Sequence, residues 1–126
     1  MWRGVAIRES FVGGVIPSQT KVVDARTSDL EGEAERGTFD FICVEVDDSD
    51  LESVSEFSIK NLRPVWYFHM VGPSHMRVYF NGCQFEFKRD DVDEIKRVVE
   101  YGVAEGIHPD QLNIEGIQGL YDDPFG

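Results

Sequence analysis

Two turn signals within residues 64–88, PVWYFHMVGPSHMRVYFNGCQFEFK, constrain the fold of this chain more than any other feature. Asn81-Gly82 is a strong hairpin signal, because both residues tolerate the positive φ that a type I′ turn requires. Gly72-Pro73-Ser74 marks a second turn, since proline fixes φ and glycine frees it. The runs between the turns are rich in aromatic and β-branched residues, which is typical of strands. The segment therefore predicts a three-stranded antiparallel meander.

The alternation of side chains sorts this meander into two faces. A two-residue turn at 81–82 pairs Phe80 with Cys83, and a three-residue loop at 72–74 pairs Val71 with His75. One face is then almost wholly apolar and consists of Trp66, Phe68, Met70, Met76, Val78, Phe80, Cys83, Phe85 and Phe87. The other face is mostly polar and consists of Tyr67, His69, Val71, His75, Arg77, Tyr79, Gln84, Glu86 and Lys88. We expect the first face to pack in the core and the second to be open or to form an interface.

The remaining elements follow from hydrophobic patterning. Short alternating or apolar runs predict strands at residues 4–8, 21–24 and 38–47. Apolar stripes predict one helix that begins near residue 48 and stops at Pro64, and a second that begins at Asp90-Asp91 and ends at Gly106. Residues 26–37 are acidic and lack periodicity, which favours an exposed loop.

These elements predict an α+β fold, a two-layer sandwich. A mostly antiparallel sheet of five to six strands carries two helices on one face, partly in a ferredoxin-like manner. A single domain is expected over residues 1–114, followed by a loose C-terminal tail at 115–126. The first helix and its flanking strands form a crossover, so these two strands should run parallel if they share a sheet.

Charge narrows the classes of partner. The chain has 24 acidic and 12 basic residues, a net charge of −12, which argues against nucleic-acid binding because that depends on neutralising phosphates. An acidic mimic of nucleic acid is one alternative that the charge allows. No apolar run is long enough for a membrane span, and no secretory signal is visible. We therefore expect a cytoplasmic protein in which Cys43 and Cys83 are small buried residues.

The polar face of the meander holds the candidate site: Tyr67, His69, Arg77, Tyr79 and Glu86. An imidazole beside a guanidinium and a carboxylate can bind an anionic ligand or shuttle a proton. The same residues also read as an ordinary cross-strand ion pair with a histidine neighbour. Aromatic residues and arginine are in addition what interface centres prefer.

The leading interpretation is a non-enzymatic interaction or dimerisation module that uses this face, either as a homodimer or with a protein partner. The alternative is a small ligand-binding protein or enzyme with a His/Arg/Glu site there. No catalytic residue is assigned, because no nucleophile elbow, phosphate loop or pair of catalytic carboxylates stands out. Neither a metal-ligand spacing nor a cofactor motif is visible, so no metal or cofactor is expected.

Three segments together resemble a small family of uncharacterised prokaryotic proteins. They are RGVAIRES near the N-terminus, WYFHM…VYFNGCQFEF in the meander and EYGVAEGIHPDQLNI near the C-terminus. The resemblance covers roughly residues 3–114. Its motifs, a hairpin containing Trp-Tyr and a helix that ends in YG…GI…QL, are structural signatures, so the resemblance implies no activity.

Overall fold

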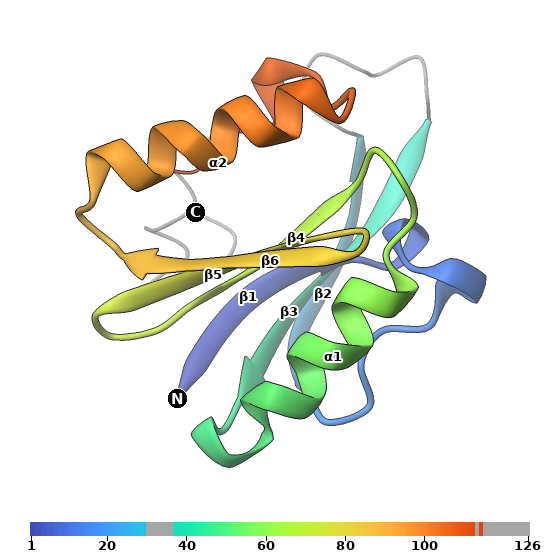
Figure 1. The fold of residues 1–126 in the computed structure, drawn as a ribbon. Coiled ribbons are helices and arrows are strands. Elements are labelled where there is room, and N and C mark those ends of the chain that lie inside the picture. The colour runs from blue at the N-terminus through green and yellow to red at the C-terminus, as the bar shows by residue number, and fades with distance from the viewer. Residues whose placement is uncertain (30–36, 113, 115–126) are drawn as a thin grey trace.

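A computed structural model describes residues 1–29, 37–112 and 114 (Figure 1). The sheet has six strands in the order β2-β3-β1-β4-β5-β6, and every described pairing is antiparallel. The strands are β1 (Trp2–Ile7), β2 (Lys21–Asp29), β3 (Thr38–Val46), β4 (Tyr67–Val71), β5 (His75–Phe80) and β6 (Cys83–Lys88). The two helices are α1 (Leu51–Asn61) and α2 (Val92–Ala104). This confirms the predicted α+β class and the predicted antiparallel sheet of five to six strands.

The ends of α2 follow the local chemistry of the sequence. Asp91 caps the helix, because its side chain accepts a hydrogen bond from the Glu94 amide at 3.2 Å. At the other end Gly106 has a φ of 96°. The amides of Gly106 and Ile107 donate to the carbonyls of Val103 and Gly102, each at 3.0 Å. This is the predicted Schellman ending, in which a left-handed glycine satisfies the last carbonyls of the helix.

Strand β1 lies between the two strands that flank α1. Because β3 and β4 each pair with β1 in antiparallel fashion, they run parallel to one another. The unit β3-α1-β4 is therefore a crossover whose strands are separated by β1, a split β-α-β arrangement. The expected parallel direction of these strands is confirmed.

The two helices lie on opposite faces of the sheet (Figure 1), so the expectation that both cover one face is wrong. Strand β5 shows this division, since its side chains alternate between faces. Met76, Val78 and Phe80 belong to a buried cluster that contains Ile95 and Val98 of α2. Tyr79 belongs to a second cluster, which contains Leu51 and Val54 of α1. We call the two sides the α2 face and the α1 face.

The cause of this error is one residue of register at the first turn. Val71 pairs with Met76, not with His75, and the Gly72 amide donates to the His75 carbonyl at 2.8 Å. The turn thus contains two residues, Pro73 and Ser74, where the sequence predicted a three-residue loop. A slip of one residue moves every side chain of a strand to the other face. Strand β4 is inverted relative to the prediction, and Tyr67 and His69 join the apolar residues of β5.

The second turn has the predicted register, with Phe80 opposite Cys83. Its type differs, because Gly82 has a φ of 89° while Asn81 is not in the positive region that type I′ requires. Contacts with the end of α1 accompany this geometry. The Asn81 Nδ2 donates to the Leu62 carbonyl at 2.6 Å, and the Gly82 amide donates to the Ile59 carbonyl at 2.8 Å. Tertiary hydrogen bonds have overridden the local preference of the Asn-Gly pair.

The predicted acidic loop at 26–37 is partly a strand, because β2 continues to Asp29 and pairs with β3 along its length. Residues 30–36 and the predicted tail at 115–126 lie outside the described residues. The last four residues of β2 therefore replace the first part of the expected loop.

Candidate functional site

The five predicted site residues do not form one surface. Tyr67 and His69 lie on the α2 face, because β4 is inverted relative to the prediction. Arg77, Tyr79 and Glu86 lie on the α1 face. The structure therefore brings together the arginine, the second tyrosine and the glutamate, and separates them from the histidine by the thickness of the sheet.

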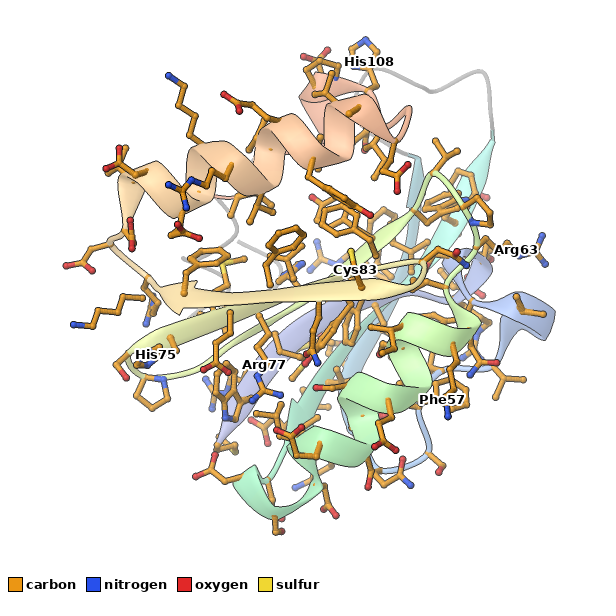
Figure 2. All side chains as sticks on the ribbon, in the orientation of Figure 1. Phe57, Arg63, His75, Arg77, Cys83 and His108 are labelled. Atoms are coloured by element: carbon orange, nitrogen blue, oxygen red, sulfur yellow. The ribbon has the colours of Figure 1, made fainter. Side chains whose placement is uncertain are left out.

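Arg77 is the centre of a polar network beneath α1, on the side of the sheet opposite Cys83 (Figure 2). Its Nε donates to Oε1 of Glu86, and its Nη2 lies 2.9 Å from Oε1 of Glu52 on α1. Its Cζ lies 5.8 Å from the ring centroid of Trp2, within the range of a cation–π contact. Burial alone would lower the pKa of Arg77, but the hydrogen bonds with the two glutamates raise it above its ordinary value.

Tyr79 completes this network at its buried end. It is fully buried, and its hydroxyl is 2.8 Å from the Ser55 hydroxyl. Ser55 in turn accepts from Nη1 of Arg77 at 3.0 Å and donates to the Leu51 carbonyl at 2.9 Å. Burial raises the pKa of Tyr79, while the hydrogen bond with Ser55 and the charge of Arg77 oppose that shift. The group joins α1 to β5 and has no opening toward solvent at Tyr79 or Ser55, so it acts as a structural link.

His69 has no such network. Its side chain is buried among the apolar residues of the α2 face, and its Nε2 has no hydrogen-bond partner among the described residues. Burial lowers the pKa of His69 to about 4, so the imidazole is neutral near pH 7. Tyr67, one pleat along β4, is anchored by a hydrogen bond from its hydroxyl to the Gln111 carbonyl. The predicted acid–base pairing of His69 with Arg77 and Glu86 is therefore not formed.

The most exposed regular element is β2, an edge strand of the sheet. Each residue from Lys21 to Thr27 is exposed, including Val22 at 53% and Val23 at 43%. A bulge interrupts the pairing with β3 between Val22 and Asp24. The Ala25 amide donates to Oδ1 of Asp24 at 2.8 Å. Edge strands present backbone groups that can pair with another strand, so β2 is the candidate interaction site.

The order of residues along β2 is complementary to itself. In an antiparallel pair of two β2 strands centred on Ala25, Asp24 of each copy faces Arg26 of the other, and Val23 faces Thr27. Asp24 and Arg26 pair with Cys43 and Phe41 of β3, so both side chains lie on the α2 face. A two-fold axis normal to the sheet keeps that face common to both copies. This edge was not predicted as a site, because the acidic run from Arg26 lacks periodicity and resembles a loop. The signal for it in the sequence is the charge order of KVVDART.

Among the described residues, no group of three His, Cys, Asp or Glu side chains is arranged to hold a metal ion. Neither described helix has the length and apolar character that crossing a membrane would require. The two cysteines are free thiols, Cys43 buried and Cys83 partly buried. Burial, followed by the charge of Glu45, raises the pKa of the Cys43 thiol, which disfavours the nucleophilic thiolate.

Comparisons with protein-family models, with characterised proteins and with solved structures found no significant match to this chain. The resemblance of its three segments to a family of prokaryotic proteins therefore remains an interpretation of the sequence.

Proposed function

We propose that this protein is a non-enzymatic interaction module of the cytoplasm that forms a homodimer by pairing its β2 edge strand with that of a second copy. The observation that carries the proposal is the self-complementary order Val23-Asp24-Ala25-Arg26-Thr27 on an exposed edge. The two sheets would become one continuous sheet across a two-fold axis. Dimerisation stays the leading function, but the surface differs from the meander face that the sequence suggested.

The backbone geometry supports pairing at Ala25. Its amide bonds to the neighbouring Asp24 carboxylate within one chain. In the dimer this amide would donate to the Ala25 carbonyl of the second copy, and Asp24 would turn to Arg26 of that copy. Opposite charges directly across an antiparallel pair each contribute about 0.2–1 kcal/mol, and like charges destabilise by similar amounts. The bulge and charges of β2 also hinder pairing with unrelated strands, so they favour a complementary partner.

Charge reversal tests this arrangement, because two single reversals should each break the dimer and their combination should restore it. Asp24→Arg places arginines opposite one another at two positions of the dimer, and Arg26→Asp places aspartates opposite one another. Each variant alone should be monomeric by light scattering at concentrations where the wild type is dimeric. The double variant, and an equimolar mixture of the two single variants, should restore dimers because every cross-strand pair is again opposite in charge.

Arg63→Glu is the matched control, since it reverses one exposed charge in the segment between α1 and β4. It should leave the dimer intact. A wild-type chain that is monomeric into the high micromolar range would contradict the proposal. So would single variants that remain dimers, or a mixture that stays monomeric although both proteins are folded by circular dichroism.

A further inference from the structure

A pocket of about 120 Å³ opens at the end of the sheet where the α1–β4 connection, the β5–β6 turn and the end of α2 meet. Its lining consists of Pro64, Val65, Trp66, Phe80, Asn81, Glu105 and Ile107. The pocket is remote in sequence from β2 and shares no residue with that edge. It has room for several heavy atoms of a small organic molecule.

The wall formed by Val65 is conformationally strained. Residues 63–66 form a turn in which the Trp66 amide donates to the Arg63 carbonyl at 3.3 Å. Pro64 occupies its second position, and Val65 has a φ of 70° at its third. A turn with this pattern normally has glycine at the third position, because a β-branched side chain is disfavoured at positive φ. Such strain is concentrated at binding sites. Here it places a valine in the wall of the pocket, although this residue is 52% exposed.

Two side chains of the lining, Glu105 and Asn81, carry acceptor oxygens. Glu105 is exposed at the end of α2, and its Oε1 accepts from the Tyr101 hydroxyl at 2.8 Å, which leaves the carboxylate a second oxygen for a ligand. The Asn81 amide is oriented by the hydrogen bond from its Nδ2 to Leu62 at 2.6 Å, so its Oδ1 serves as the acceptor. Trp66 and Phe80 add aromatic rings. Tyr101 packs on Phe80 with ring centroids 4.9 Å apart, and so holds Glu105 and this ring in one unit.

We propose that this pocket binds a small free organic ammonium ion. Aromatic rings attract a cation through their quadrupole, and a carboxylate at the rim neutralises its charge. An anion would meet Glu105 without a cationic partner among the lining residues, and the net charge of −12 adds to that repulsion. A quaternary or alkyl ammonium group combines apolar surface for the walls with a positive charge for the Glu105 carboxylate.

Choline chloride is a suitable probe, and 3,3-dimethylbutan-1-ol is its uncharged counterpart of the same shape. In ¹H–¹⁵N spectra of the full chain, choline should produce saturable shifts at the Val65 amide, the Trp66 indole and the Gly106 amide, with a dissociation constant in the millimolar range. The neutral alcohol should bind at least about tenfold more weakly, because it lacks the cation that the rings and the carboxylate recognise. Equal binding of the two compounds, or no saturable shift with choline, would overturn the proposal.

Two variants localise the site. Glu105→Gln keeps the hydrogen bond with Tyr101 but removes the charge, and it should weaken choline binding by about tenfold. Glu100→Gln is the matched control, since it removes one exposed carboxylate from the same helix outside the lining, and it should bind like the wild type. Val65→Gly should lose binding while the chain stays folded, because glycine accepts the turn geometry but removes the wall. Equal losses in both glutamate variants, or unchanged binding in Val65→Gly, would reject the pocket as the site.

Discussion

The two faces of the sheet bury polar groups in different ways. On the α1 face, Arg77, Tyr79 and Ser55 form a network in which the buried hydroxyls and the guanidinium have partners. On the α2 face, the Nε2 of His69 is buried without a partner among the described residues. A buried polar group that has a hydrogen-bond partner stabilises the fold modestly, whereas one without a partner costs the full free energy of its desolvation. Replacing His69 of the α2 face by an apolar residue should therefore stabilise the fold, whereas truncating Arg77 of the α1 face should destabilise it.

The largest expected difference in stability between the two faces comes from adding a methyl group at a tightly packed glycine on each face. A Cβ added to Gly4 on β1 would lie 2.2 Å from the His69 carbonyl oxygen, a backbone atom. A Cβ added to Gly102 on α2 would lie 2.8 Å from the end of the Leu112 side chain. Gly4→Ala should lower the free energy of unfolding by about 3 kcal/mol or more, since the sheet must part, whereas Gly102→Ala should cost about 1 kcal/mol. Urea unfolding measures both, and equal losses would show that the β1–β4 contact can relax.

The buried imidazole of His69 should make the α2 face sensitive to acid. The folded-state pKa of His69 is about 4, below the unfolded value of about 6.5. Below that unfolded value the unfolded chain binds more protons, so stability falls as the pH is lowered toward 4. Between pH 7 and pH 4 this group should cost about 2.5 kcal/mol.

His69→Leu tests this prediction, because it removes the titrating group together with a nitrogen that has no partner in the described part of the chain. The variant should be more stable than the wild type, and the difference should widen as the pH falls. His108→Gln removes an exposed imidazole and serves as the control. A difference between wild type and His69→Leu that is independent of pH would contradict a buried neutral imidazole.

On the α1 face, removing the centre of the network should destabilise the fold. Arg77→Ala leaves Ser55 and the two glutamates without their cation and removes the contact with Trp2. We expect a loss of about 2 kcal/mol, since the Arg77 side chain is only 15% exposed. Arg97→Ala breaks a pair with Glu94 in which the arginine is 72% exposed, and it should cost under about 0.5 kcal/mol. Thermal unfolding of the two variants compares them directly.

Within the network of the α1 face, the smallest effect is expected for the buried hydroxyl of Tyr79. Tyr79→Phe keeps the ring stacked on Phe68 but removes one partner of Ser55. Ser55 retains Arg77 and the Leu51 carbonyl, so the loss should be about 1 kcal/mol. If the substitution is neutral, the hydroxyl pair contributes no net stability and the network depends on Arg77 alone.

Strand positions and helix ends were predictable because they depend on neighbours in the chain. Proline and glycine marked the turns, alternation marked β4 to β6, and Asp91 and Gly106 marked the ends of α2. The candidate site was less predictable. Arg77 and Glu86 are partners as expected, because the Asn81-Gly82 turn set their register. His69 was misplaced because Gly72-Pro73-Ser74 was read as a three-residue loop.

The sequence by itself thus determined the composition of the meander, the class of fold and the opposite charges that lie along β2. Only the tertiary structure decided which side of the sheet each residue of β4 occupies and that both sides are covered by a helix. The physical reason is that alternation identifies a buried face only when the other face is exposed to water. With α1 on one side and α2 on the other, both registers of β4 place apolar side chains in a core, so packing selects between them.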